Sequence, residues 1–201
     1  SGETKLDTAP SEIGDYTVKI TGRGNYGETA VKSFSITRKD LADTGITIDE
    51  ISETTFTAGG TEPTIVVKDN GTEITSYTVT YAPATRGDTT AHIGENGKPS
   101  SVGTYVATIT GAGNYTGAMT RTFTVVAKSL SDPTITIDDI QNQVSDGTDK
   151  TPEPVVKDGT TLLVKGTDYT VAYYESDGVT STTPNGTGTY VVKVTAKEGS
   201  N

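Results

Sequence analysis

Hydrophobic and polar residues alternate with a period of two in many short segments of this chain. In the segment DYTVKIT, Tyr16, Val18 and Ile20 occupy every second position and the residues between them are polar. This period is that of a β-strand with one face buried and the other in water. The pattern predicts strands at Asp15–Thr21, Ser33–Thr37, Tyr77–Tyr81, Thr104–Thr110, Thr122–Val126, Tyr169–Tyr173 and Thr189–Thr195.

Two further pairs of strands are predicted from near-identical segments. ITIDEI is matched by ITIDDI, and TIVVKD is matched by EPVVKD; these segments are Ile46–Ile51, Ile135–Ile140, Thr64–Asp69 and Glu153–Asp158. Short turns such as Asp69-Asn70-Gly71 separate the strands and favour antiparallel pairing. No run of ten or more residues combines helical apolar spacing with a capping residue, so we expect negligible helix.

The sequence also repeats itself. Gly14–Ile51 reappears without a gap as Gly103–Ile140, each matching residue displaced by 89 positions. A third copy of one strand contains Tyr190, which lies 85 positions after Tyr105. The differences in length fall in loops, as expected when the repeated object is a folded unit.

We place the boundaries between units at Arg38–Leu41 and Lys128–Leu130. Residues 1–39 are then the C-terminal strands of a first repeat, residues 40–128 a complete repeat, and residues 129–201 a repeat that lacks its last strand. An incomplete sandwich leaves an apolar face and a strand edge uncovered.

We therefore hypothesise a strand exchange in which residues 1–39 complete the third unit of a neighbouring molecule or of the same chain. A Phe34 that is both exposed and unpaired would contradict this hypothesis.

About seven short antiparallel strands per unit predict an all-β chain of tandem immunoglobulin-like β-sandwich repeats. A β-grasp unit is the alternative, but it would need a helix. Only 31% of the residues are hydrophobic and there is no Trp, so the cores must be thin layers of Val, Ile, Tyr and Phe.

Composition excludes several classes of function. The absence of cysteine excludes disulfides, thiolate metal sites and cysteine nucleophiles. The net charge of −10, with no basic run, argues against a nucleic-acid partner. No segment approaches the about 18 consecutive apolar residues that a membrane-spanning helix needs, and Ser1 does not begin a signal peptide.

The order of the motifs resembles a known family. A Pro-x-Val-x-Val-x-Asp strand, a Gly-Thr-Asp-Tyr-Thr-Val-x-Tyr strand, a Gly-Thr-Tyr start and a Gly-x-Gly-Asn-Tyr-x-Gly turn have their nearest matches at Pro152–Asp158, Gly166–Tyr173, Gly188–Tyr190 and Gly111–Gly117. This set resembles the Ig-like repeats found in tandem in large surface proteins of Gram-positive bacteria. The resemblance implies an Ig-like fold and extracellular display, at the cell surface or by secretion. The middle repeat departs from it, since Ile74-Thr75-Ser76 precedes Tyr77.

The Gly22-x-Gly24-Asn25-Tyr26 motif could suggest a phosphate-binding loop, but such a loop uses the amides of a following helix. We interpret it as a turn between two strands, with Tyr26 closing the end of the sandwich.

Carboxylates and lysines offer two further candidates. Calcium could bind at Asp138-Asp139, Asp49-Glu50, or Asp146 with Asp149, but no spacing matches a defined calcium loop, so we favour solvated turn residues. An amide crosslink, which would release ammonia, could join lysines to matching asparagines; the candidates are Lys68 and Lys157 with Asn25, Asn114 and Asn201.

Catalysis has little support in the sequence. The one histidine, His92, lies with Arg86 in the Ala82–Ser101 loop, which the other copies do not share. We expect His92 to be solvated, and we expect no catalytic, cofactor-binding or metal-binding residues and no enzymatic activity.

The sequence favours a structural spacer of a bacterial surface protein, whose partners are neighbouring repeats of the same parent protein. Two alternatives remain open. One is an adhesin module that binds host glycan or protein through the Ala82–Ser101 loop or exposed tyrosines, and the other is an accessory module of a carbohydrate-active enzyme. The ligand of an adhesin is not readable from the sequence.

Overall fold

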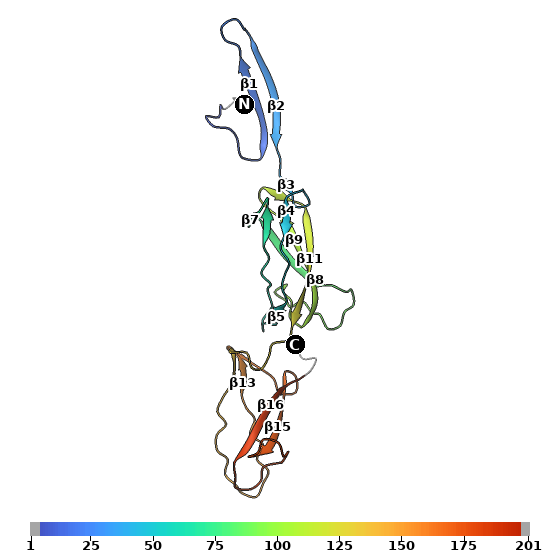
Figure 1. Ribbon diagram of the computed structural model, residues 1–201, viewed down its shortest axis with the longest axis vertical. Helices are drawn as coiled ribbons and strands as arrows, with labels where there is room; N and C mark the ends of the chain where they lie inside the picture. Colours follow the sequence, from blue (N-terminus) through green and yellow to red (C-terminus); the bar gives the residue numbers. More distant parts are fainter. Residues whose placement is uncertain (1–4, 198–201) are drawn as a thin grey trace. The chain divides into compact units, whose positions relative to one another are not determined.

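A computed structural model describes residues 5–197 of the chain (Figure 1). These residues form strands and no helix, so the prediction of an all-β chain is confirmed. The strands are β1 Gly14–Thr21, β2 Thr29–Ile36, β3 Lys39–Asp40, β4 Ile46–Ile48, β5 Thr54–Thr55, β6 Val67–Asp69, β7 Thr72–Ile74, β8 Tyr77–Pro83, β9 Gly103–Gly111, β10 Tyr115–Thr116, β11 Ala118–Val126, β12 Ile135–Ile137, β13 Val156–Asp158, β14 Thr161–Leu162, β15 Tyr169–Glu175 and β16 Tyr190–Ala196.

The described chain divides into two compact units. Unit 1 contains the chain up to Ile51 together with Thr64–Tyr81 and Val106–Thr122, and unit 2 contains Ser52–Pro63, Ala82–Tyr105 and the chain from Phe123. The sheets β1-β2, β10-β3 and β4-β6-β7 belong to unit 1, and β12-β13-β14 and β15-β16 belong to unit 2. Residues of the four-stranded sheet β5-β11-β9-β8 fall in both units.

Each strand predicted from alternation is present, but several lengths differ. β2 and β11 begin four residues earlier than predicted, whereas β4 and β12 end at Ile48 and Ile137. β6 and β13 begin only at the matching residues Val67 and Val156.

The two three-stranded sheets share one register. Ile46 faces Asp69 across β4 and β6, and Ile135 faces Asp158 across β12 and β13, both pairs displaced by 89 positions. Backbone hydrogen bonds follow the same displacement, since Asn70 N donates to Gly45 O and Gly159 N donates to Thr134 O. The repeated sequence therefore forms the same local backbone pairing twice.

The predicted turn at Asp69-Asn70-Gly71 is confirmed. It joins β6 to β7, with φ of 47° at Asn70 and 83° at Gly71. Positive φ at both central positions is the requirement of a type I′ hairpin turn, which Asn-Gly satisfies with little strain.

Both units bury a small apolar core. The buried apolar side chains of unit 1 are Leu41, Ile46, Ile48, Ile51, Val67, Ala107 and Ile109. Those of unit 2 are Ala91, Tyr105, Phe123, Val125, Val156 and Tyr169. The core thus consists mainly of β-branched and aromatic residues, as the composition predicts.

Burial follows the alternation in β9 but not in β1. Tyr105, Ala107 and Ile109 of β9 are all 0% exposed. The prediction that β1 buries its matching face is wrong, because Val18 and Ile20 are 45% and 59% exposed. The cause is that the described residues before β3 form a single hairpin, with no second layer of their own to cover that face (Figure 1).

The strand-exchange hypothesis would be contradicted by a Phe34 that is both exposed and unpaired. Phe34 of β2 is exposed, but it is not unpaired. Its side chain is 43% exposed, but β2 is paired with β1 and the Phe34 ring stacks on Tyr16 with centroids 5.6 Å apart. The matching rings of Tyr105 and Phe123 stack at 5.9 Å. The structure therefore leaves the strand-exchange hypothesis open.

Three tyrosines anchor the segments that lead into their strands. The hydroxyls of Tyr16, Tyr105 and Tyr190 each bond the backbone carbonyl four residues earlier, at 2.9, 2.8 and 3.5 Å. The Tyr105 hydroxyl also accepts a hydrogen bond from His92 N at 3.0 Å and contacts the Ser101 hydroxyl at 2.9 Å. This buried network ties the Ala82–Ser101 loop to β9.

We predict that Tyr105→Phe lowers the free energy of unfolding by about 1–3 kcal/mol, because it leaves buried polar groups without a partner. Urea unfolding curves would measure the loss. The matched control is Tyr16→Phe, whose hydrogen bond is exposed and whose effect should stay within about 0.5 kcal/mol. Equal effects in the two variants would contradict the prediction.

Candidate functional site: the lysine–aspartate clasps

Two lysines displaced by 89 positions bind two matching aspartates. Lys39 Nζ lies 2.5 Å from Asp69 Oδ1, and Lys128 Nζ lies 2.7 Å from Asp158 Oδ1. Each lysine belongs to a predicted boundary segment, and each aspartate is the last residue of a strand, β6 or β13. We call each of these pairs a clasp, since it fastens a boundary segment to the sheet that follows it.

In the first clasp, three groups bind the Asp69 carboxylate. Besides Lys39, the Tyr115 hydroxyl donates to Asp69 Oδ2 at 3.2 Å and Asn70 Nδ2 donates to Oδ1 at 2.9 Å. The hydrogen bond from the Lys39 ammonium holds the pKa of Asp69 below its usual range, against partial desolvation. Desolvation and the Asp69 carboxylate together raise the pKa of the Tyr115 phenol. The cluster therefore favours an ionised Asp69.

Backbone hydrogen bonds also hold the segment around Lys39 in place. β3 pairs in parallel with β10, and Lys39 N donates to Asn114 O at 3.0 Å while Leu41 N donates to Thr116 O at 2.9 Å. Gly117 follows β10 with φ of +75°, and a Cβ at this position would collide with the Asp40 carboxylate. The close approach of the boundary segment therefore requires glycine here.

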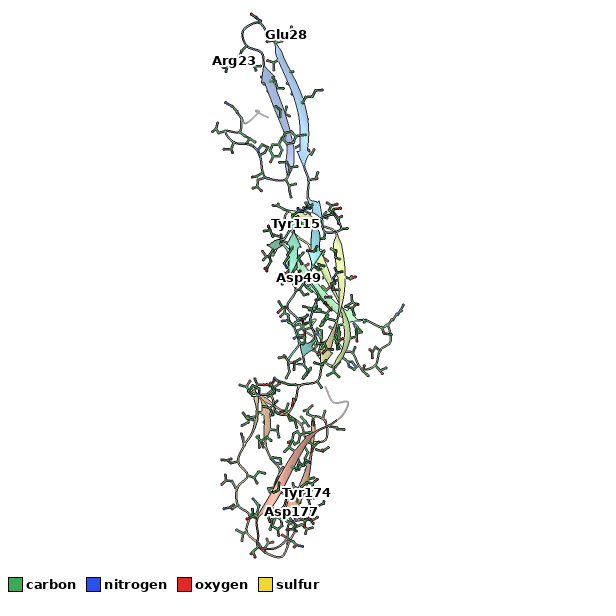
Figure 2. The ribbon with its side chains drawn as sticks, in the orientation of Figure 1. Arg23, Glu28, Asp49, Tyr115, Tyr174 and Asp177 are labelled. Carbon is green, nitrogen blue, oxygen red and sulfur yellow. The ribbon has the colours of Figure 1, made fainter. Side chains whose placement is uncertain are left out.

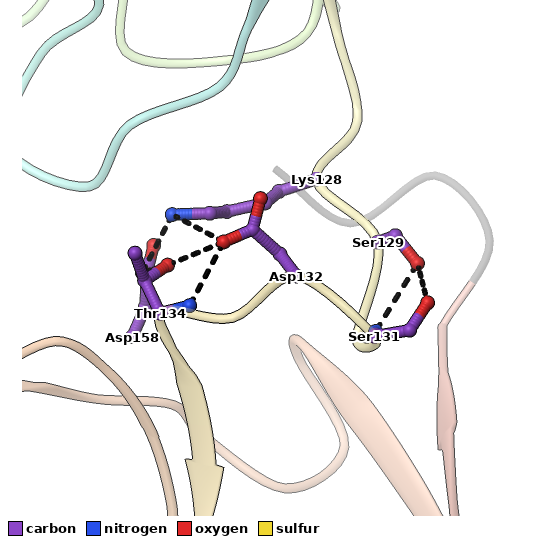
Figure 3. Close-up of polar contacts among 6 residues, drawn as sticks. All are labelled: Lys128, Ser129, Ser131, Asp132, Thr134 and Asp158. Atoms are coloured by element: carbon purple, nitrogen blue, oxygen red, sulfur yellow. Dashed lines mark hydrogen bonds and ion pairs between the residues drawn. The ribbon is translucent and has the colours of Figure 1, made fainter.

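In the second clasp, the lysine reaches two carboxylates (Figure 3). Lys128 Nζ lies 4.0 Å from Asp132 Oδ1 in addition to its contact with Asp158. The Thr134 hydroxyl lies 2.7 Å from Asp132 Oδ1 and 2.8 Å from Asp158 Oδ1. The Thr134 backbone N–H is the main cause of the lowered pKa of Asp132.

This second clasp is the better shielded from water. The Lys128 and Asp158 side chains are 15% and 10% exposed, compared with 32% and 20% for Lys39 and Asp69. A charge pair that is partly removed from water is screened less by salt and is costlier to break from one side.

A second repeated ion pair joins each central strand, β6 or β13, to the residue just after its neighbour β4 or β12. Lys68 Nζ is 2.5 Å from Asp49 Oδ2, and Lys157 Nζ is 2.7 Å from Asp138 Oδ2. All four side chains are between 34% and 47% exposed, so water competes with both pairs. Such pairs contribute only about 0–1 kcal/mol each. Figure 2 labels Asp49 and also Tyr115 of the first clasp.

The Gly22–Tyr26 motif forms a turn, as we interpreted it. Gly22 N donates to Glu28 O at 3.0 Å, and β2 rather than a helix follows. The prediction that Tyr26 closes the end of a sandwich is wrong, because its side chain is 79% exposed. The matching Tyr115 is half-buried because β6 supplies Asp69 as its partner. Arg23 and Glu28 mark the Tyr26 loop in Figure 2.

The carboxylates that we considered as calcium ligands are not grouped into a metal site in the described residues. Within residues 5–197, no three histidine, aspartate or glutamate side chains are grouped so that they could hold a metal ion. Asp49 and Asp138 bind lysines, and Asp146 binds Lys150 and Thr148. The Lys150 hydrogen bond is the main cause of the lowered pKa of Asp146.

The lysines considered for a crosslink have carboxylate partners. Lys68 binds Asp49 and Lys157 binds Asp138, and the Asn114 backbone carbonyl accepts a hydrogen bond from Lys39 N. Asn201 lies outside the described residues. A crosslink from either lysine to asparagine would have to replace an ion pair.

His92 is exposed, as predicted, and its Nδ1 contacts Thr90 O at 2.9 Å. Parts of the surrounding loop are nevertheless built into the fold, because Ala91 is 3% exposed and Ser101 is 0% exposed. Most of the other residues of the Ala82–Ser101 loop are exposed or half-buried, and Thr85, Arg86 and Gly87 form one exposed stretch.

The clasps were not predicted from the sequence, although a signal for them was present. Lys39 and Asp69 are separated by 30 positions, as are Lys128 and Asp158. A charge pair that recurs at constant separation within a repeat indicates contact, but only when the strands between the two residues are known to bring them together.

Comparison with protein-family models, with curated proteins and with solved structures gives no match for this chain. Residues 5–197 contain no helix long and apolar enough to cross a membrane.

We predict that Lys128→Met lowers the free energy of unfolding of the C-terminal segment by about 1–3 kcal/mol, because it leaves Asp158 shielded without its charged partner. The matched control is Lys157→Met, which breaks an exposed pair and should cost about 0–1 kcal/mol. Chemical denaturation followed by tyrosine fluorescence would measure both. The same small loss in both variants would contradict the prediction.

We also predict a dependence on pH that is specific to the first clasp. The folded-state pKa of Asp69 is lowered, so its stabilisation is complete above the ordinary carboxyl pKa of about 3.9 and is lost as the pH falls below that value. The difference in melting temperature between the wild type and Asp69→Asn should therefore shrink between about pH 5 and pH 2. A constant difference across this range would show that Asp69 does not act through its charge.

Proposed function

We propose that this chain is a non-catalytic spacer module, built from tandem immunoglobulin-like β-sandwich repeats, of an extracellular protein of the bacterial cell surface. The observation that carries the proposal is the recurrence of the clasps and of the strand register at a displacement of 89 residues. A spacer needs folded units of constant length and fastened boundaries between them.

Three features support the immunoglobulin-like part of the proposal. The strand pairs β1-β2, β15-β16 and β4-β6 are antiparallel. An aromatic pair, Tyr105 with Phe123, packs in the core, and the Tyr105 hydroxyl bonds the backbone upstream of its strand. Immunoglobulin-like sandwiches commonly contain a tyrosine with such a backbone bond. Residues 40–128 would then be the complete repeat, with residues 1–39 and 129–201 as parts of its neighbours.

The strand pairing suits a module that carries tension. β5 pairs in parallel with the end of β11, with Thr54 facing Val125 and Thr55 facing Val126. Tension would enter β5 from its N-terminal side and leave β11 at its C-terminal side. Parallel strands pulled in opposite directions load their hydrogen bonds together rather than one after another.

The clasps would add to this resistance at the boundaries. Lys39 and Lys128 are the residues through which tension would pass from one repeat to the next, and each is held by an aspartate of the following sheet. The partners of this chain would accordingly be neighbouring repeats of the same parent protein.

Adhesion is the second candidate, and one observation favours it. Tyr26 is 79% exposed in a loop that also contains Arg23. An exposed aromatic ring with polar neighbours suits stacking on a glycan or contact with a host protein. Loss of glycan or host-protein binding in Tyr26→Ala would distinguish adhesion from a purely structural role.

Single-molecule stretching of the chain between two handles would test the spacer proposal. We expect the middle repeat to unfold in one step that lengthens the chain by roughly 250 Å, as 89 residues pass from folded to extended. Lys39→Met should lower the unfolding force, and the control Lys68→Met should leave it nearly unchanged. Gradual extension at low force, without a step, would contradict the proposal.

A further inference from the structure

Three asparagines of the chain stand directly before a glycine: Asn70, Asn96 and Asn185. In such a dipeptide the backbone nitrogen of the glycine can attack Cγ of the asparagine, because glycine has no Cβ to restrict the backbone or obstruct the approach. The attack closes a succinimide ring and expels ammonia, and water then opens the ring to an acid. The reaction needs a free side-chain amide and a backbone that can rearrange, so the surroundings of each asparagine decide whether it occurs.

The fold holds Asn96 in an arrangement that opposes this reaction. Asn96 Nδ2 donates to Gly59 O at 2.6 Å, and Asn96 Oδ1 accepts a hydrogen bond from Lys98 N at 3.0 Å. The attacking nitrogen is engaged as well, since Gly97 N donates to Gly94 O at 2.9 Å. Closing the ring would disturb all three hydrogen bonds.

Asn70 is held by the turn between β6 and β7. Asn70 Nδ2 donates to Asp69 Oδ1 at 2.9 Å, and Asn70 N donates to Gly45 O at 2.8 Å. Asp69 and Thr72 face each other across the two strands and fix the two residues between them. Gly71 N therefore cannot rotate onto the Asn70 side chain unless the hairpin opens.

Asn185 lacks this protection. Its side chain is exposed, and within residues 5–197 neither the Asn185 side chain nor Gly186 N takes part in a hydrogen bond. The space beside Gly186 is open, because a Cβ placed there would meet its nearest atom, the Tyr190 hydroxyl oxygen, only at 3.7 Å. The side-chain amide, the attacking nitrogen and the surrounding space are thus all available for ring closure.

The loop around Asn185 has a counterpart in the middle repeat. Lys150 N donates to Pro184 O at 2.6 Å. At the matching place of the middle repeat, Thr61 N donates to Pro99 O at 2.8 Å. Both prolines are buried and lie 85 positions apart, which is the displacement of the third strand copy. The two loops therefore take the same place in their repeats.

The residues that follow these two prolines differ. Ser100 and Ser101 follow the proline of the middle repeat. Ser101 is fully buried, and its hydroxyl donates to Thr90 O at 2.5 Å. Asn185 and Gly186 follow the proline of the later copy. The reactive dipeptide thus stands in one copy at a position that serines occupy in the other.

We propose that Asn185 is a site of spontaneous deamidation in the folded protein, and that the fold protects Asn70 and Asn96 from the same reaction. Gly186 N loses its proton and bonds to Asn185 Cγ, and the side-chain nitrogen leaves as ammonia. Water then attacks one of the two ring carbonyls. Attack at the side-chain carbonyl gives aspartate, and attack at the main-chain carbonyl gives isoaspartate. The net change is the gain of water and the loss of ammonia, which adds one negative charge.

Isoaspartate changes the loop more than aspartate does, because the main chain then runs through Cβ and gains one carbon. The change falls between two contacts that hold the loop. One is the hydrogen bond of Lys150 N with Pro184 O, and the other is the contact of the Tyr190 hydroxyl with Gly186 O at 3.5 Å. Deamidation would therefore alter the segment that leads into β16 and leave the middle repeat unchanged. The proposal goes beyond the spacer function and does not depend on it.

Peptide mapping by mass spectrometry tests the proposal on the folded chain, incubated for several days in mildly alkaline buffer. Asn185 should gain about 1 Da, and methylation by a protein isoaspartate methyltransferase should detect the isoaspartate product. Asn70 and Asn96 should convert at least about fivefold more slowly, because their hydrogen bonds must break first. Conversion of Asn70 or Asn96 as fast as Asn185, or an Asn185 that stays an amide, would overturn the proposal.

The chain unfolded in urea is the control for the role of the fold. All three Asn-Gly dipeptides should convert at similar rates there, because the hydrogen bonds that protect Asn70 and Asn96 are lost. The same order of rates in the folded and the unfolded chain would show that local sequence sets the order, and would overturn the proposed protection.

Two variants restore the residues of the middle repeat. Gly186→Ser fits the open space beside this position and should leave Asn185 largely unmodified, because the added side chain obstructs the attacking nitrogen. Asn185→Ser removes the target and should abolish the gain of mass in this loop. Conversion of Asn185 in Gly186→Ser at the rate of the wild type would overturn the assignment of Gly186 N as the attacking group.

Discussion

An apolar face of a β-strand is stably folded only when a second layer or a neighbouring strand covers it, and this constraint governs the whole structure. β9 satisfies it, since Tyr105, Ala107 and Ile109 are fully buried. β1 has nearly the same sequence pattern but presents Val18 and Ile20 to water. Identical alternation thus leads to a core in one segment and to an exposed apolar face in another, and the difference is the presence of the covering strands.

The clasps depend on the same layering. Asp69 and Asp158 are brought to their lysines because β6 and β13 take the same place in two sheets of equal register. Once the sheets form, the carboxylates are partly shielded and the hydrogen bonds that they accept become worth more than those of exposed pairs such as Lys68 with Asp49. Electrostatic fastening of the boundaries is therefore a consequence of packing and not its cause.

The proposed spacer function is based on the structural features that recur along the chain and on those that occur only once. The register, the clasps and the aromatic pairs recur, whereas the Ala82–Ser101 loop occurs once and is held to β9 at its C-terminal end by Tyr105 and Ser101. In the function that we propose, the recurring features would serve extension and mechanical strength. Such a role would use backbone pairing and burial, for which neither a metal nor a nucleophile is needed.

The sequence by itself determined the strands with clear alternation or repetition, the Asn70-Gly71 turn and the 89-residue displacement, because these are local or direct properties of the chain. The short strands β3, β5, β7, β10 and β14 were not predicted. It could not determine which alternating faces are buried, as the exposed Tyr26, Val18 and Ile20 show. Nor could it bring Lys39 to Asp69, since 30 residues separate them. Only the tertiary structure decided these points, because burial and ion pairing depend on which strands lie beside one another.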